Sequence, residues 1–423
     1  MNLQRGIAMR ARVKHRKSII LFLSFLPGLL SCQTPASTPA AENPPDLHFV
    51  LRAKEGRTQF RLGETIEIQV AYSSDIPDKY LWIGPGLVTK VKDRRSAEFA
   101  LQPPEHRIDR VKNSGVANPF LVLHAHCGAG VGGGVGSGCS DCDGQISLKP
   151  SPVFFPYSLT AQFQILEPGH YLVRAQTADV IQSPLSEESH PIPLVSNEVE
   201  FDVVADPLWS TNTLRDAVER FEKAKLEYTA KGWDKIPRDK MEGAQFAKRS
   251  DLEYEMQQAA ETMRVLDTEE SLAELVRHYD GLVHEYDYAQ HILYRGIIQS
   301  RHQALAIKLL SERILEPDSS VSREVLDQLT GMTLRNQFPD LFSRNDADSW
   351  RQLYPAARKI LHDYVLALGK SLAEKKPDAL TRSVTAFRSY AAADFCTGKP
   401  LVPASVAKQL VQHLDESETD SQH

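Results

Sequence analysis

Histidine and cysteine side chains come close together in one short stretch of the chain. His124, His126 and Cys127 precede GAGVGGGVGSG, and Cys139 and Cys142 follow it. Thiolates and imidazoles at these spacings could bind zinc or copper. The thiols could instead form disulfides, or the C-S-D-C pair could cycle as a redox couple. No cofactor is expected if the disulfide interpretation holds, and zinc or copper is the alternative.

The disulfide interpretation is favoured because the chain carries an export signal, described below, and exported thiols normally pair. Apart from Cys32, four cysteines are available, and they allow three pairings among which the sequence does not choose: Cys127, Cys139, Cys142 and Cys396. The C-S-D-C pair also lacks the helix start that activates a thioredoxin-like thiol. Intact-mass measurement with and without reductant distinguishes a sealed disulfide from bound metal or free thiols.

Two further motifs are incomplete. Residues 128–133 match G-x-G-x-x-G, but a dinucleotide site also needs a helix to begin there, and more glycines and two cysteines follow instead. His284 and Glu285 begin like the zinc motif H-E-x-x-H, but Tyr288 stands where the second histidine should be. Neither nucleotide binding nor zinc peptidase chemistry is predicted, and the chain is not expected to be an enzyme.

The first 31 residues have the order of an export signal. A block with six basic residues and no acidic one precedes the apolar run SIILFLSFLPGLL and the small residue Ser31. The apolar run is shorter than the roughly 20 residues that a membrane-spanning helix needs. We therefore expect residues 1–31 to be a signal peptide, beginning at Met1 or at Met9.

Leu29-Leu30-Ser31-Cys32 resembles the bacterial lipobox. The resemblance implies that Cys32 is acylated, becomes the first mature residue and inserts into a lipid bilayer. Residues 32–45, rich in Pro, Ala and Thr, would then be an extended tether. Neither position 33 nor position 34 is Asp, which by resemblance to enterobacterial sorting implies the outer membrane, with the domains facing the periplasm or the exterior.

The charge of the chain argues against nucleic-acid partners. The formal net charge is −6, and it becomes −12 once the basic leader is removed. A chain this acidic should not bind nucleic acid or an anionic lipid surface.

Residues 46–205 have the pattern of strands. Apolar and polar residues alternate in TIEIQVAYS, where Ile66, Ile68, Val70 and Tyr72 should share a buried face. Similar runs occur in LHFVLRA, KYLWIG, PFLVLHAH, LTAQFQIL, HYLVRAQTA and NEVEFDVVA. RLGETIEIQV, PGHYLVR and SNEVEF resemble strands of immunoglobulin-like domains in exported bacterial proteins. The resemblance implies an immunoglobulin-like β-sandwich with the Gly-rich cysteine loop, residues 124–144, between two of its strands.

Residues 206–414 have the pattern of helices, and residues 415–423 are expected to be a disordered tail. Leu272, Leu275, Val276 and Tyr279 keep the spacing of one helix face. Thr268 should cap that helix, and residues 300–303 have the form of a capping box. Further helices are predicted over 356–372, 380–393 and 404–414. A resemblance to HEAT-type repeats is found in ETMRVLDTEESLAELVRHYDG and in LYRGIIQSRHQALAIKLLSERILEPDSSVSREVLDQL. The resemblance implies a curved all-α array, and a non-repeating bundle is the alternative.

The whole arrangement resembles uncharacterised exported bacterial lipoproteins that pair an immunoglobulin-like domain with HEAT-like helices. It favours an envelope-anchored, non-catalytic binding or scaffold protein with an envelope protein as partner. The alternative is a metal-binding or thiol-redox protein that uses the Gly-rich loop. Aromatic side chains favour interfaces, and one cluster is a candidate partner surface, unless it packs between helices: Tyr279, His284, Tyr286, Tyr288 and Tyr294.

Overall fold

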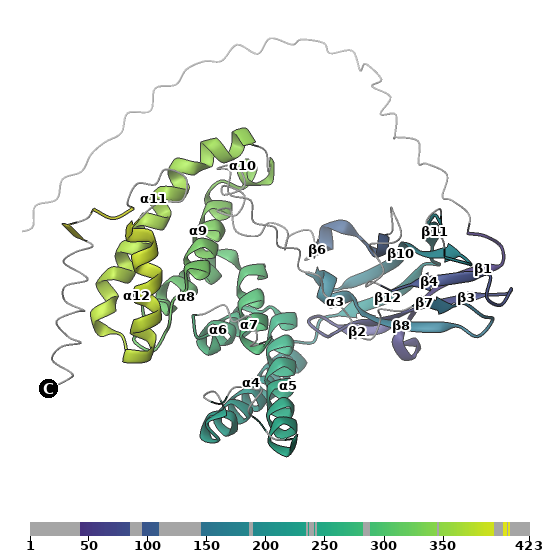
Figure 1. Ribbon diagram of the computed structural model, residues 1–423, viewed down its shortest axis with the longest axis horizontal. Helices are drawn as coiled ribbons and strands as arrows, with labels where there is room; N and C mark the ends of the chain where they lie inside the picture. The colour runs from purple at the N-terminus through teal and green to yellow at the C-terminus, as the bar shows by residue number, and fades with distance from the viewer. Residues whose placement is uncertain are drawn as a thin grey trace, which may run out of the picture. The chain divides into compact units, whose positions relative to one another are not determined.

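The computed structural model has a β-rich region followed by a helical region, as the sequence patterns predict (Figure 1). The last strand ends at Val204 and the next helix begins at Pro207. The structure describes residues 43–84, 95–109, 145–185, 189–233, 236, 241, 243–281, 288–344, 347–392, 401–403 and 405–406.

Three antiparallel strands form the first sheet. Their order is β1 (Leu47–Ala53), β3 (Glu67–Ser74) and β8 (Val153–Ser158). Buried and exposed residues alternate strictly along β1, as expected for a strand with one face in the core. The predicted inward face of β3 is confirmed, since Ile66, Ile68, Val70 and Tyr72 are at most 1% exposed.

The second sheet is built around the long strand β10 (Gly169–Gln182). β12 (Val199–Val204) pairs with β10 in antiparallel fashion and with β2 (Gln59–Arg61) in parallel. Four more strands complete the sheet: β4 (Tyr80–Ile83), β5 (Arg95–Gln102), β7 (Gln145–Ser147) and β11 (Ile192–Val195). Two further strands pair separately, namely β6 (Arg107–Asp109) and β9 (Phe163–Ile165).

One apolar core joins strands of both larger sheets. Trp82 of β4 stacks on Phe155 of β8 with ring centroids 4.3 Å apart. Phe49 of β1, Tyr171 of β10 and residues of β12 belong to the same buried cluster. Burial of this shared apolar surface is the main stabilising contribution to the β-rich region.

Part of the strand prediction is wrong. The first half of LTAQFQIL forms a short helix, α3 (Leu159–Gln162), because the Ser158 hydroxyl accepts a hydrogen bond from the backbone N–H of Ala161 and caps it. Six described strands were not predicted, namely β2, β5, β6, β7, β8 and β11. Pro156 interrupts the strand pattern of β8, and the structure accommodates it because β8 lies at the edge of its sheet. PFLVLHAH lies outside the described residues.

The helices of the second region share one continuous buried cluster. They are α4 (Pro207–Ala230), α5 (Gly243–Leu266), α6 (Glu269–His278), α7 (Tyr288–Gln299), α8 (Gln303–Arg313), α9 (Arg323–Gln337), α10 (Pro339–Arg344), α11 (Ala347–Ser371) and α12 (Pro377–Ala392). Short 3₁₀ turns occur at Lys54–Gly56, Pro104–His106 and Leu372–Glu374. None of these described helices combines the length and the apolarity needed to span a membrane.

One predicted helix cap is confirmed and another is wrong. Thr268 caps α6 through a reciprocal pair of hydrogen bonds with Ser271. The capping box expected over residues 300–303 does not form, because α8 begins only at Gln303 and the Ser300 hydroxyl accepts from the His302 N–H at 3.1 Å, one residue too early for a capping box. Of the helix predicted over 404–414, only positions 405 and 406 are described, and both are helical.

Residues 314–322 lie between α8 and α9. They form hydrogen bonds with Lys375 and with residues 280–281. The Lys375 ammonium donates hydrogen bonds to the carbonyls of Ile314, Glu316 and Ser319 at 2.9, 2.9 and 2.8 Å. The backbone of residues 280–281 pairs with residues 320–322, through Ser320 N–H to Asp280 at 3.0 Å and Ser322 N–H to Gly281 at 3.2 Å. We call these interactions the 314–322 junction.

Candidate functional site

An open groove of ≈ 470 Å³ lies beside β1. One wall consists of Leu47 to Val50, and the opposite wall consists of Val195 to Asn197 at the end of β11. Asn43, Pro44 and Pro45, which precede β1, form the remaining side. The volume falls within the range of about 300–1,000 Å³ that is usual for ligand sites.

Two asparagine side chains bridge the walls of the groove. The Asn43 amide donates to the Val195 carbonyl at 2.8 Å and accepts from the Val195 N–H at 2.9 Å. In the same way, the Asn197 amide accepts from the Leu51 N–H at 2.8 Å and donates to the Leu51 carbonyl at 3.0 Å. Each amide thus makes the two bonds that a residue of a neighbouring strand would make.

The free edge of β1 faces the groove. The bonds to Asn197 show that the N–H and C=O of Leu51 point away from β3. Because this direction alternates along a strand, the N–H and C=O of Phe49 also point away from β3. Phe49 lines the groove, so its main chain offers one donor and one acceptor to a bound segment.

The segment that leads into the groove is firmly held. Asp46 accepts hydrogen bonds from the Lys79 ammonium at 2.6 Å and from the Tyr80 hydroxyl at 3.0 Å. The hydrogen bond from Lys79 holds the pKa of the Asp46 carboxyl below its ordinary value. Together with the Asn43 bridge, these bonds hold residues 43–46 against the β-rich region.

A histidine, an aspartate and a serine lie close to the groove, but they do not form a catalytic triad. His48 Nε2 lies 3.0 Å from Asp75 Oδ1, and Ser73 is the cross-strand neighbour of His48. The His48 and Asp75 side chains are 44% and 63% exposed, and the described contacts include no hydrogen bond from Ser73 to His48. A nucleophile needs a base within hydrogen-bond reach, and the described contacts do not place Ser73 within such reach of His48.

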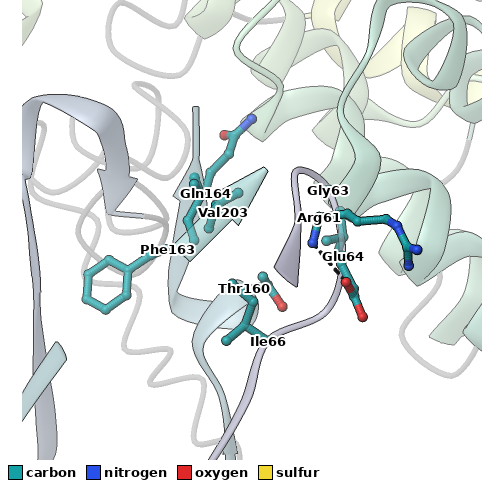
Figure 2. A pocket seen from close by; sticks show the side chains of 10 residues that line it. Arg61, Gly63, Glu64, Ile66, Thr160, Phe163, Gln164 and Val203 are labelled. Carbon is teal, nitrogen blue, oxygen red and sulfur yellow. Dashed lines mark hydrogen bonds between the residues drawn. The ribbon is translucent and has the colours of Figure 1, made fainter. Parts of the chain in front are cut away.

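A second cavity, of ≈ 10 Å³, lies against the β-rich region (Figure 2). Its lining includes Ile66, Thr160 and Phe163. The dashed line beside it in Figure 2 is the hydrogen bond from the Arg61 N–H to Glu64, at 2.9 Å. This space holds about one water molecule, so of these two cavities the groove is the one large enough for a ligand.

The predicted partner surface in the helical region is only partly exposed. Tyr279 and Tyr294 are 0% and 6% exposed, and their rings stack with centroids 5.7 Å apart. Burial raises the pKa of the Tyr279 hydroxyl well above its ordinary value. Both rings pack between helices, so including them in a partner surface is wrong for this fold. Tyr288 is 58% exposed, and His284 and Tyr286 lie outside the described residues.

The residues of the predicted thiol or metal chemistry all lie outside the described residues. They are Cys32, His124, His126, Cys127, Cys139, Cys142 and Cys396. Within the part of the chain that the structure describes, no group of three or more His, Cys, Asp or Glu side chains is arranged to hold a metal ion. The disulfide and metal interpretations both remain predictions.

Sequence reasoning missed two buried ionisable side chains, His278 and Lys375, which are 7% and 6% exposed. Burial lowers the pKa of Lys375 to about 8, although its three carbonyl acceptors favour the charged form. Neither residue belongs to a motif, and each is buried partly by residues distant in sequence: Phe221 packs on His278, and residues 314–319 accept from Lys375.

The comparisons with known proteins identify no family for this chain. No family model, no curated protein and no solved structure matches it. The site geometry and the sequence patterns therefore carry the functional argument.

Proposed function

We propose that the protein is an exported lipoprotein, anchored to the cell envelope through Cys32, that works by binding another envelope component and performs no catalysis. The observation that carries the proposal is Leu29-Leu30-Ser31-Cys32, which stands between a basic and apolar leader and a Pro/Ala/Thr-rich tether. The tether leads directly to Asn43 at the groove, so the anchor and the candidate binding site are neighbours in sequence.

The proposal includes an immunoglobulin-like β-sandwich. Three observations support it: two sheets share one core, β1 and β2 follow each other in the chain but belong to different sheets, and Tyr171 makes a tyrosine-corner contact. The Tyr171 hydroxyl, near the start of β10, donates to the carbonyl of Glu167 at 2.6 Å. A hydroxyl that bonds to the backbone a few residues upstream at this place is a hallmark of such domains.

The proposal also includes a HEAT-like array after the sandwich. Three residues, 300–302, separate α7 from α8, and the apolar faces of the helices belong to one buried cluster that extends from α4 to residues after α12. An array in which each helical pair packs on its neighbours buries its apolar surface in this continuous way.

We propose an extended segment of an envelope protein as the occupant of the groove. The Phe49 main chain faces the groove, and Asn43 and Asn197 already pair with its walls as strand residues would. An extended segment gains affinity by adding main-chain hydrogen bonds to such an edge. Val50 is 43% exposed at the groove and can contribute apolar contact.

Lipid labelling tests the anchor. Cells that produce the protein and are fed labelled palmitate should incorporate label and retain the protein in the membrane fraction, because a thioether-linked lipid and an acyl chain bind the bilayer together. Cys32→Ala should abolish labelling and release the protein from membranes. As a control, Cys396→Ala should label like the wild type. Wild-type protein that stays unlabelled in the cytosol would contradict the whole proposal.

Site-specific photo-crosslinking tests the groove. Val50, Ala71 and Phe154 form one cross-strand row, in which Val50 lies at the groove and Phe154 lies at the opposite edge of the same sheet. Val50 and Phe154 are exposed to a similar extent, 43% and 41%. A photoreactive residue at position 50 should crosslink to a single extended segment in intact envelopes, and one at position 154 should not.

The segment identified in this way can then be tested as a peptide. A synthetic decapeptide of that sequence should bind the purified protein, and the same peptide N-methylated at the residue that donates to the Phe49 carbonyl should bind about fivefold more weakly, since that lost hydrogen bond costs about 1 kcal/mol. Equal crosslinking at positions 50 and 154, or equal binding of both peptides, would rule out the groove as the docking edge.

A further inference from the structure

His278, the last residue of α6, is buried against α4. Its imidazole lies 4.8 Å from the Phe221 ring, measured between centroids, and its side chain is only 7% exposed. No described residue forms a hydrogen bond with its Nε2 atom, although that atom is fully covered. A buried nitrogen without a hydrogen-bond partner lowers stability, so an apolar ring of similar size would pack here at less cost.

Two carboxylates and three cations surround this imidazole. Nε2 lies 3.6 Å from Glu274 Oε2 and 3.9 Å from Glu222 Oε1. The Arg277 guanidinium already pairs with both carboxylates, at 2.6 Å to Glu274 and 2.9 Å to Glu222. Lys225 of α4 and Arg313 of α8 also act on His278 as positive charges. A proton on His278 would therefore enter a buried site in which the cations already outnumber the anions.

We propose that His278 is a proton-operated latch between α4 and α6. The neutral imidazole packs on Phe221 and holds the two helices together, and protonation drives the ring out of this position and loosens α4 from α6. The inference is independent of the proposed function, since it concerns only described residues of the helical region.

The direction of the effect follows from the protonation equilibrium. Burial, assisted by Arg277 and Lys225, lowers the pKa of His278 from 6.5 to about 4 in the packed state. In an open state, the ring is solvated and its pKa returns to the ordinary value. The packed state is then fully stable above pH 6.5, and it loses stability as the pH falls from 6.5 towards 4.

Hydrogen exchange of the full chain tests the latch. From these pKa values, the opening constant of α4 and α6 amides should rise about 20-fold between pH 7 and pH 5, after correction for intrinsic exchange. His278→Phe keeps the contact with Phe221 and removes the titrating group, so it should abolish this rise. Amides of α11 serve as the internal control and should show no comparable change in either protein.

Two outcomes would overturn the proposal: the 20-fold rise persists in His278→Phe, or α11 opens in parallel with α4 and α6. If His278→Phe does not fold, as judged by its circular dichroism, the titration of the wild-type His278 ring by NMR decides. A midpoint near 4 supports the latch, and a midpoint of 6.5 or higher refutes it.

Discussion

Gly281→Ala should destabilise the helical region by at least about 3 kcal/mol and lower its melting temperature by about 10 °C. Gly281 has φ of +85°, and a Cβ atom added there would lie 1.7 Å from the carbonyl oxygen of Ser320. The overlap involves backbone on both sides, so no side-chain rotation can relieve it. Relief requires separating residues 280–281 from residues 320–322, which breaks the two hydrogen bonds that pair them.

Gly232→Ala is a matched control. Gly232 also has a positive φ, +66°, but an added Cβ would meet no atom within 4 Å. This substitution should therefore cost only the left-handed backbone conformation, about 1 kcal/mol. Thermal melts followed at 222 nm report the helical region for both variants. If the two alanines shift the transition equally, then steric contact at the 314–322 junction contributes nothing and the argument for Gly281 is wrong.

The parts of the fold that sequence could predict are those decided by local alternation. Ile66, Ile68, Val70 and Tyr72 share a buried face because side chains of a strand alternate regardless of its neighbours. The helix cap at Thr268 was also predictable, because its partner Ser271 lies only three residues away. Local physics sufficed wherever both partners lie within one element.

Sequence reasoning failed where contacts with distant residues decide the outcome. The Ser300 hydroxyl was expected to cap α8, but it donates to the distant Asp267 at 2.7 Å and accepts from the His302 N–H at 3.1 Å, and α8 begins only at Gln303. The sequence does not distinguish Tyr279 and Tyr294 from Tyr288. Helix packing buries Tyr279 and Tyr294 and leaves Tyr288 exposed. An aromatic residue in a helical pattern is compatible with a buried or an exposed position, because the pattern does not show which helix faces pack against other helices.

The candidate groove could not have been predicted either. Its walls come from residues 43–50 and 195–197, which are about 150 residues apart in the chain and meet only through the pairing of strands. The leader and lipobox are the reverse case: they are read from sequence order alone. The proposed function therefore combines an anchor that sequence suggests with a groove that only the fold reveals.

Lys375→Met should destabilise the helical region by about 3 kcal/mol. Two effects compete. The methionine removes the desolvation of a buried ammonium, which lowers the pKa of Lys375 to about 8 and corresponds to about 3 kcal/mol. It also removes three hydrogen bonds from a charged donor, each contributing about 1.5–3 kcal/mol, and leaves the carbonyls of Ile314, Glu316 and Ser319 without that donor. The second effect is larger because a methionine thioether cannot donate to the carbonyls it leaves behind.

Lys376→Met isolates this effect. Lys376 is the exposed neighbour of Lys375; the substitution preserves the bond from its backbone N–H to the Pro317 carbonyl at 2.8 Å and removes only a charge near the exposed Asp318. Its change in stability should stay within about 0.5 kcal/mol, as is usual for surface substitutions. Urea denaturation followed at 222 nm compares the two variants directly. A Lys375→Met protein as stable as Lys376→Met would mean that desolvation outweighs the three carbonyl bonds, and that the ammonium is tolerated at the 314–322 junction without stabilising it.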